Sequence, residues 1–169
     1  TSLETVTIED LSQITTIGER AFSGDSRADF VLSDGTENQL DLSQVDTLGT
    51  YAFNGCSQLA GVTLSGDLPE IPAYAFQSTG LETIEIPEGV TTIGAHAFEN
   101  CQLSKITLPS TLTEIQEYAF ARPSGSPNTA LTELTIPENV TTIGAHAFYN
   151  YQGLTKVTIG GNSLSKPGA

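Results

Sequence analysis

The residues of this 169-residue sequence that could bind a metal or act as a catalytic base include two histidines. His96 and His146 stand in identical GAHAF segments, so they occupy the same position in two copies of one pattern. If such copies stack about 4.8 Å apart, two steps separate the imidazoles by roughly 10 Å, too far for one zinc ion with bonds near 2.1 Å. We interpret both histidines as surface residues of the repeated pattern, because no nucleophile or orienting acid recurs beside them.

The two cysteines, Cys56 and Cys101, also share one position in copies that are not neighbours. A disulfide needs Cα atoms within about 7 Å, whereas residues two copies apart are separated by roughly 10 Å. We therefore expect both to be small, buried, apolar residues that form no disulfide. They do not indicate the redox compartment of the protein.

Acidic residues that lie close together in sequence are candidates for acid–base or calcium chemistry: Glu9 with Asp10, Asp25 with Asp29, and Asp34 with Glu37. The segment DGTEN at 34–38 lacks the D-x-[DN]-x-[DN]-G spacing of a calcium loop, which favours a solvated acidic turn. A weak calcium site in 24–39 stays open, as do paired carboxylates of the glycosidase type, although no pair stands out. We expect no cofactor, because the glycines recur with the repeat and form no phosphate-binding loop.

The elements that must position these residues come from an internal repeat. The segment VTTIGAHAF is identical at 90–98 and 140–148, and an Ile-Pro-Glu tripeptide precedes each copy. The dipeptide Ala-Phe occurs six times, ending at Phe22, Phe53, Phe76, Phe98, Phe120 and Phe148. Alignment gives a unit of 22 to 23 residues, L-x-x-[IV]-x-[IL]-P-x-x-[VL]-x-x-I-G-x-x-A-F-x-x-C-x. A period of this length is typical of a solenoid, in which stacked units bury a continuous core.

Each unit predicts two strands and a corner. The L-x-x-[IV]-x-[IL] part alternates apolar and polar residues, which predicts a strand with inward residues such as Val62 and Leu64. A proline ends this strand, because proline cannot donate to the ladder. The V-x-x-I part predicts a second short strand, and the x-x-A-F part predicts a single helical turn that directs the phenylalanine inward. Positive φ is expected at the glycines of the corner between them: Gly18, Gly49, Gly94 and Gly144.

The repeats predict one domain over residues 1–160, followed by a C-terminal tail at 161–169. Within it the repeats are regular over 59–159 and irregular over 1–58. Since the sequence contains no Met and no signal peptide, we expect a mature or trimmed piece, which is compatible with a removed export signal; neither a signal nor an anchor is present in this chain.

Two insertions interrupt the period. Residues 24–39 contain Phe30-Val31-Leu32 before Asp34-Gly35, which predicts a short strand with a tight turn, in the manner of a hairpin flap. Residues 121–130 contain two prolines and no periodicity, which predicts a surface loop. Insertions of this kind lie on one face of a solenoid and are where an individual function is expected.

The charge of the chain excludes some classes of partner. The net charge is −14, with fourteen acids against two arginines in residues 1–85 and six acids against four cations in residues 86–169. An acidic chain without a basic stripe repels phosphate backbones, so we expect no nucleic-acid partner. Anionic membrane surfaces are disfavoured for the same reason, and no apolar run approaches about 18 residues, so we expect no membrane insertion in this segment.

The motif IPExVTTIGAHAF(E/Y)N, with Cys101 in the column that follows, resembles the BspA-like leucine-rich repeats over roughly residues 3–160. The animal leucine-rich repeat has an Asn column (LxxLxLxxN) that is missing here, and Pro occupies that turn. Three other residues replace the family's Cys: Thr79, Pro123 and Tyr151. The resemblance implies a leucine-rich-repeat solenoid of the α-β horseshoe class, mostly β, wound as a right-handed superhelix with short strands and helical turns. It also implies a secreted or surface-anchored bacterial protein that acts in adhesion to host matrix proteins or other cells.

Exposed strand positions form the candidate partner-binding surface. Side chains in these columns stand side by side across parallel strands and make a flat, Thr-rich platform. We name as the partner-binding ladder Thr63, Glu85, Lys105, Thr107, Glu133, Thr135, Lys156 and Thr158. Threonine also suits an exposed strand without any partner, and the platform lacks the Trp, Tyr and Arg anchors of binding hot spots. The alternative surface is a group of tyrosines near the Ala-Phe corner: Tyr51, Tyr74, Tyr118, Tyr149 and Tyr151.

The favoured function is therefore a non-enzymatic, extracellular or cell-surface module for protein interaction or adhesion. The first alternative is a structural spacer that displays another domain, in which the ladder residues can be changed without loss of adhesion. The second is a glycan hydrolase that uses acids of the 24–39 insertion, such as Asp29 and Asp34. The partner and the oligomeric state stay open.

Overall fold

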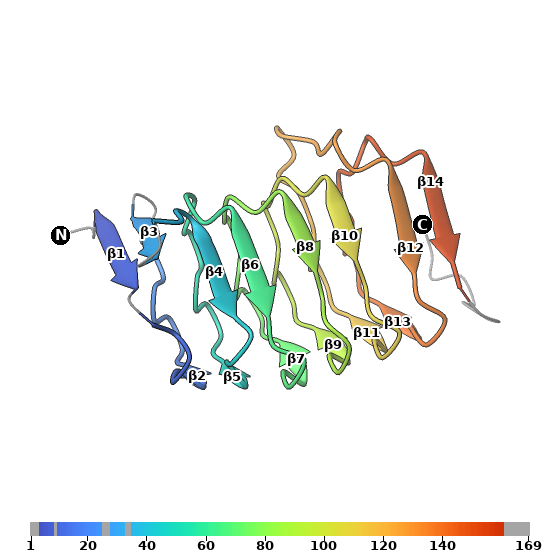
Figure 1. Ribbon diagram of the computed structural model, residues 1–169. Helices are drawn as coiled ribbons and strands as arrows, with labels where there is room; N and C mark the ends of the chain where they lie inside the picture. Colours follow the sequence, from blue (N-terminus) through green and yellow to red (C-terminus); the bar gives the residue numbers. More distant parts are fainter. Residues whose placement is uncertain (1–3, 9, 25–27, 33–34, 161–169) are drawn as a thin grey trace.

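The computed structural model describes residues 4–8, 10–24, 28–32 and 35–160. In these residues the chain winds into a mostly-β solenoid of about seven parallel stacked turns. Figure 1 shows a row of longer strands with a second row of short strands below it. The longer strands are β1 (Thr5–Ile8), β3 (Asp29–Leu32), β4 (Gln39–Leu42), β6 (Gly61–Leu64), β8 (Thr83–Glu85), β10 (Lys105–Thr107), β12 (Glu133–Ile136) and β14 (Lys156–Ile159).

The second row contains one two-residue strand from each complete turn. These are β2 (Thr16–Ile17), β5 (Thr47–Leu48), β7 (Glu70–Ile71), β9 (Thr92–Ile93), β11 (Glu114–Ile115) and β13 (Thr142–Ile143). Named strands pair in parallel, and equivalent residues of neighbouring turns face each other, as Ile93 and Ile115 do. The predicted division of the unit into two extended segments is confirmed.

The core is a set of columns that run along the solenoid axis. Inward strand residues are buried as predicted, with Ile84 at 3% and Ile106 at 9% exposure. The Ala-Phe phenylalanines form one continuous stack, with neighbouring ring centroids 5.1–5.5 Å apart from Phe22 to Phe148. Each repeat of the sequence therefore contributes one phenylalanine ring to the stack.

The predicted helical turn at the Ala-Phe corner is wrong, because the described residues contain no helix. The backbone amides of this corner alternate between two kinds of partner. Ala52 donates to the carbonyl of Gly49 in its own turn at 3.3 Å, whereas Phe53 donates to Ala75 in the neighbouring turn at 2.8 Å. A helix needs consecutive bonds within the chain, and every second amide is used here to join the turns.

The prediction of positive φ at the corner glycines is also wrong. Among the glycines with positive φ in the described residues, Gly18, Gly49, Gly94 and Gly144 do not occur. Three of the four are required instead by the close approach of the preceding turn. A Cβ at Gly49 would lie 2.3 Å from the Glu19 backbone nitrogen, and one at Gly94 would lie 2.6 Å from that of Ala73. A side chain at these positions would force neighbouring turns apart.

The N-terminal insertion joins the longer row of strands. The strand predicted at Phe30-Val31-Leu32 is confirmed as β3, which pairs in parallel with β1, and an antiparallel bridge joins Val31 to Glu37. The segment is not a flap, however, because the Phe30 ring is fully buried and lies 6.2 Å from that of Phe53. Part of the insertion therefore belongs to the core.

The solenoid presents apolar residues at its last turn. In β14 the inward positions Val157 and Ile159 are 50% and 49% exposed, whereas the equivalent residues of β12, Leu134 and Ile136, are buried. The predicted tail at 161–169 lies outside the described residues. No helix in the described part of the chain is long and apolar enough to cross a membrane.

Candidate functional site

The predicted partner-binding ladder occupies one face of the longer row of strands. All eight of its residues are exposed, on β6, β8, β10, β12 and β14. The register brings Glu85 opposite Thr107 and Thr135 opposite Thr158. We call this face the sheet platform. Its position on the molecule is as predicted, and its role in binding stays a prediction.

Charged residues of the sheet platform are sparsely paired. The Nζ atom of Lys156 lies 3.3 Å from a carboxylate oxygen of Glu133, and both side chains are about two-thirds exposed, at 64% and 66%. An exposed pair of this kind contributes little to stability, at most about 1 kcal/mol. Both side chains therefore stay available for a partner.

A shallow hollow of about 400 Å³ interrupts the sheet platform at β4, β6 and β8. Gly61 has no side chain there, and the amide of Gln39 lies over its Cα, so that a Cβ at Gly61 would collide with Gln39. Thr63, Thr83 and Glu85 complete the rim. The hollow gives a partner a place to insert a polar side chain.

A column of stacked aromatic rings runs along the Ala-Phe corner. The ring centroids of Tyr51 and Tyr74 are 4.4 Å apart, those of Tyr74 and His96 are 4.6 Å apart, and Tyr118 lies 5.0 Å from His96 and 5.0 Å from His146. The Arg20 guanidinium covers the free face of the Tyr51 ring at 4.7 Å. Three of the five tyrosines expected near this corner thus belong to a continuous ladder that includes both histidines. Tyr149 lies edge-on to His146, and Tyr151 is buried against Phe148, so the prediction of a surface role is wrong for Tyr151.

Sequence reasoning missed the backbone that supports this aromatic ladder. All six residues in the position before Ala-Phe have positive φ, between 55° and 61°: Arg20, Tyr51, Tyr74, His96, Tyr118 and His146. The left-handed conformation is uncommon for residues with a side chain. The signal that could have revealed the ladder is compositional, since only Arg, Tyr and His occupy this column. Because the rings stack on each other, mainly their edges face solvent.

The histidines form no metal site in the described residues. His96 Nδ1 lies 2.8 Å from a carboxylate oxygen of Glu99, and that carboxylate also accepts a hydrogen bond from Gln77. No group of three His, Cys, Asp or Glu side chains in the described part of the chain is arranged to hold a metal ion. The side chains of His96, Glu99 and Gln77 thus form a row of hydrogen bonds beside the aromatic ladder.

The two cysteines are buried, as predicted. Cys101 donates to the carbonyl of Phe76 at 3.1 Å and lies 3.2 Å from the Thr79 hydroxyl. Burial raises the pKa of the Cys101 thiol to about 11. A thiol held protonated in this way is a poor nucleophile and a poor metal ligand.

The candidate acids are dispersed in the described part of the chain. Asp10 is exposed, and hydrogen bonds from the Ser12 amide and hydroxyl lower the pKa of its carboxyl. Asp29 accepts a hydrogen bond of 3.4 Å from the Asn38 side chain. Glu9, Asp25 and Asp34 lie outside the described residues. Asp10 and Asp29 thus accept hydrogen bonds from nearby residues.

Residues 121–130, predicted to form a surface loop, contain neither helix nor strand, and two of them are buried anchors. Arg122 and Asn128 are each only 4% exposed. The Asn128 amide donates to the Leu103 carbonyl at 2.7 Å and accepts from the backbone of Ala130 and Leu131. Figure 1 shows the loop rising above the end of the strand row where β8, β10 and β12 begin. The loop walls a polar hollow of about 670 Å³ beside it, which also touches Glu82.

An apolar hollow of about 540 Å³ lies at the N-terminal end of the solenoid. Residues of the first turn line it, among them Val6, Ile8, Leu11, Ile14 and Phe22. The hollow is the end of the core itself, which the first turn covers incompletely. Ile14 is 41% exposed in consequence.

Comparison with known proteins places these features in a family. The family model described as a BspA-type leucine-rich repeat region matches residues 1–126 and 124–167, with six copies. Among solved structures, the chain is similar to a leucine-rich cell surface protein from Faecalibacterium prausnitzii, with 32% identity and a TM-score of 0.77. That match covers 95% of this chain and 40% of the other, so this chain spans less than half the length of that protein.

Two further solved structures are more distant. A leucine-rich repeat protein from Bacteroides capillosus is 24% identical with a TM-score of 0.49, over 94% of this chain and 88% of that one. The T. pallidum leucine-rich repeat protein is 23% identical with a TM-score of 0.47, over 92% of this chain and 58% of that one. No functionally curated protein matches the chain.

Proposed function

The chain belongs to the BspA-type leucine-rich repeat family, and from this premise we propose that it is a non-enzymatic module that binds a protein partner outside the cell. The relative from F. prausnitzii is named a cell surface protein, and we extend that location to this chain on the strength of the similarity. The partner we propose is a host matrix protein or another protein of a cell surface, so that the module acts in adhesion.

The sheet platform is the observation that carries this proposal. Parallel pairing holds β8 in register with β10 and β12 in register with β14, so within each pair the exposed columns present their side chains at fixed spacing. Five strands at about 4.8 Å give a face roughly 20 Å across and about 13 Å long, which would form the centre of an interface that needs about 800 Å² on each partner. A rigid face also loses little conformational entropy on binding, which favours affinity.

The non-enzymatic part of the proposal rests on how the polar groups are used. The carboxylate of Glu99 is engaged with both His96 and Gln77, and the thiol of Cys101 is buried and protonated. Neither group is presented to a substrate with a second catalytic group beside it. We therefore propose binding without turnover.

A binding assay with matched variants tests the proposal. The double variant Thr107→Arg with Thr135→Arg places two large cations on the sheet platform. The control, Thr16→Arg with Thr47→Arg, makes the same change on paired, exposed threonines of β2 and β5. Against a panel of immobilised matrix proteins, we expect the first variant to lose binding by roughly tenfold or more and the control to keep it.

Other outcomes of this assay point elsewhere. Equal loss in both variants would place the partner off the sheet platform. Adhesion of the whole protein that survives change of all eight ladder residues to Ser, with no binding by this chain alone, would support the structural spacer. Turnover of a glycan that Asp29→Asn abolishes would overturn the non-enzymatic proposal.

A further inference from the structure

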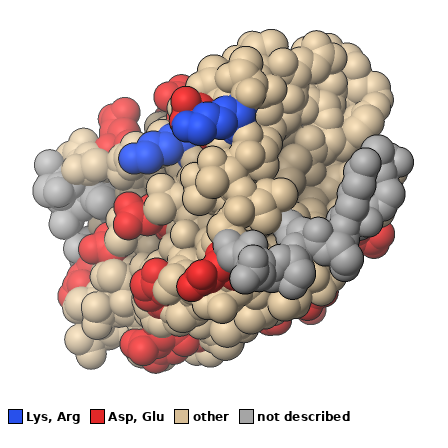
Figure 2. Space-filling model, turned by 90° about the vertical axis from the view of Figure 1, so that its right-hand side faces the viewer, with Lys and Arg blue, Asp and Glu red and all other residues tan. Residues whose placement is uncertain are grey.

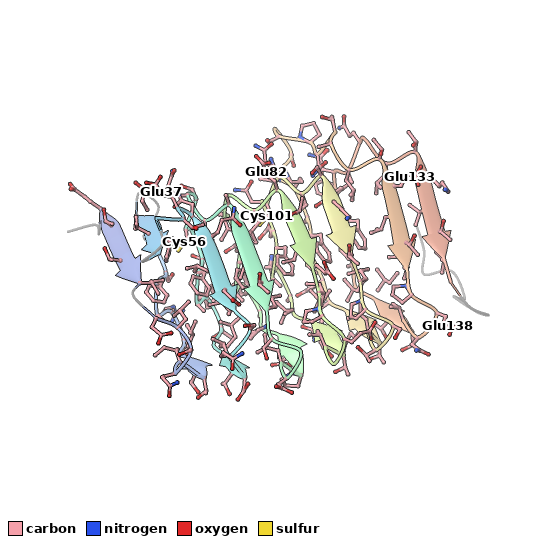
Figure 3. The ribbon with its side chains drawn as sticks, viewed as in Figure 1. Glu37, Cys56, Glu82, Cys101, Glu133 and Glu138 are labelled. Carbon is pink, nitrogen blue, oxygen red and sulfur yellow. The ribbon has the colours of Figure 1, made fainter. Side chains whose placement is uncertain are left out.

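The polar hollow beside the 121–130 loop has a buried cation in its wall. Its lining includes Arg122, Ser126, Asn100, Gln102, Ser104 and Glu82. In Figure 3, Glu82 marks the start of β8 at the edge where the loop stands. We call this site the Arg122 hollow. It lies outside the sheet platform and rests on different residues.

Arg122 is buried without an acidic partner. Its Nε donates to the Ser126 carbonyl at 3.1 Å, its Nη1 to the Asn100 side-chain oxygen at 3.0 Å, and its Nη2 to the Ser126 hydroxyl at 2.8 Å. No Asp or Glu of the described residues forms an ion pair with it. A buried guanidinium held only by neutral groups is unusual, because buried charges are normally paired.

The guanidinium keeps donors that its protein partners do not use. Arginine has five N–H groups, and the three recorded bonds leave one on each terminal nitrogen. Because Arg122 lines the hollow, we propose that the Arg122 hollow binds the carboxylate of an acidic sugar residue. Two terminal N–H groups of one guanidinium match the two oxygens of a carboxylate.

The rest of the lining fits a polyhydroxylated ligand. The Gln102 amide can donate to and accept from sugar hydroxyls, and the hydroxyl oxygens of Ser104 and Ser126 can accept from them. The Ser104 hydroxyl donates to the Glu82 carbonyl, and the Asn100 amide bonds Ser78 and Arg122, which fixes these groups in the wall. The lining contains no aromatic or large aliphatic side chain, so the apolar side chains of a peptide would gain nothing there. The volume of about 670 Å³ falls within the usual range of ligand sites.

The charge around the hollow limits the ligand to one carboxylate. Glu82 lies in the same wall, and the chain has a net charge of −14. Arg122 supplies one positive charge, which offsets the repulsion between Glu82 and a single ligand carboxylate. A phosphate, a sulfate or a run of acidic groups would carry more negative charge than Arg122 can offset. A terminal uronic acid meets this requirement.

Titration of the whole chain with glucuronic acid and with glucose, followed by two-dimensional NMR, tests the proposal. The two sugars differ at the carboxylate, so their difference in affinity measures the Arg122 contact. We expect saturable binding of glucuronate, roughly tenfold or more tighter than glucose, with shifts confined to the hollow. Equal affinity for the two sugars, or no saturable binding of glucuronate, would overturn the proposal.

Variants separate ligand binding from loop support. Arg122→Gln is expected to bring glucuronate down to the affinity of glucose, although it also removes bonds that hold the loop. Gln102→Glu keeps Arg122 in place and adds a second carboxylate to the hollow, so we expect glucuronate binding to fall roughly fivefold or more. The control Gln44→Glu adds the same charge at an exposed position beyond β4 and is expected to leave binding unchanged.

The outcome with Gln102→Glu decides the assignment if Arg122→Gln does not fold. Unchanged glucuronate binding by Gln102→Glu would overturn the site. N-acetyl-triglycine, which carries a carboxylate on a peptide, distinguishes the ligand class. If it binds as tightly as glucuronate, the hollow is a carboxylate site for peptides and the assignment to sugars is wrong.

Discussion

Single residues stabilise this solenoid mainly by packing against their counterparts in the next turn. Phe98 lies between Phe76 and Phe120, with centroid distances of 5.5 and 5.3 Å, and its side chain is fully buried. Each such ring serves two interfaces at once. The stability of a turn therefore depends on residues of both of its neighbours, as expected when stacked units bury one core.

Phe98→Ala is expected to lower the free energy of unfolding by about 3–5 kcal/mol, because it removes a ring from both interfaces and leaves a cavity. Urea denaturation followed by circular dichroism measures the loss. Phe148→Ala is the matched control: Phe148 ends the stack and is only half-buried, so its loss should be clearly smaller. Equal losses would contradict the stacked-column description.

The Cys101 thiol gives a second prediction at this scale. Burial raises its pKa to about 11 from an ordinary 9.0, so between these values the folded chain keeps a proton that the unfolded chain has lost. The contribution of this thiol to stability is therefore complete below pH 9.0 and is lost as the pH rises toward 11.

In a Cys56→Ala background, the remaining thiol should react with a thiol reagent at pH 8 only after urea unfolds the chain. Labelling of Cys101 in the absence of urea, at the rate of an exposed cysteine, would show that this region opens readily.

The turn, with its two strands and corner, is the element that the repeat encodes. Backbone amides alternate between bonds within a turn and bonds to the next, as Ala52 and Phe53 do. This arrangement fixes the distance between turns and leaves no room for a Cβ at Gly94. The spacing of turns is thus a property of backbone contacts as well as of the core.

Gly94→Ala is expected to destabilise the fold by about 1–3 kcal/mol, because the added Cβ would lie 2.6 Å from the Ala73 nitrogen. Gly125→Ala is the control, since nothing lies within 4 Å of a Cβ there. Thermal denaturation of both variants checks the difference. A Gly94 variant as stable as the Gly125 variant would mean that the turns can separate freely.

Sequence alone predicted the strands correctly but not the conformation of the Ala-Phe corner. The strands at positions such as Ile84 and Ile106 follow from alternation, since burial of one face is a property of each segment by itself. The corner was mistaken for a helical turn because the positive φ at Tyr51 depends on the bond from its amide to Ala73 of the next turn. The sequence of one repeat does not show which backbone groups of the next turn it will contact.

The candidate sites show the same division. The sheet platform was found because exposed positions of a strand follow from its period. The Arg122 hollow was not found, because Arg122 and Asn128 sit in a segment without periodicity and only the fold shows that they are buried. Phe30 was likewise assigned to a flap, although its ring completes the core beside Phe53.

At the scale of the whole molecule, charge and repetition decide what the surface can bind. Figure 2 views the molecule from its C-terminal end. Acidic side chains lie along one side and the lower edge, and the basic ones gather in a single patch near the top. The net charge is −14, and the described residues present no extended basic surface to a polyanion on this face. Its partners should therefore be proteins or weakly charged ligands.

The expected result with polyanions is an absence of binding. Neither heparin nor duplex DNA should be retained by the immobilised chain at about 0.15 M salt, where repulsion is screened beyond roughly 8 Å. Surface plasmon resonance measures this directly. Binding that weakens steeply with added salt would reveal a basic site and contradict the charge argument.

Photo-crosslinking from the sheet platform tests the central proposal most directly. A photoreactive amino acid at Thr107, on β10, should form an adduct with a matrix protein that binds the chain, because Thr107 lies within the platform. The same amino acid at Thr47, on β5 in the row of short strands, is expected to form none. Adducts of equal yield from both positions, or from Thr47 alone, would contradict the account.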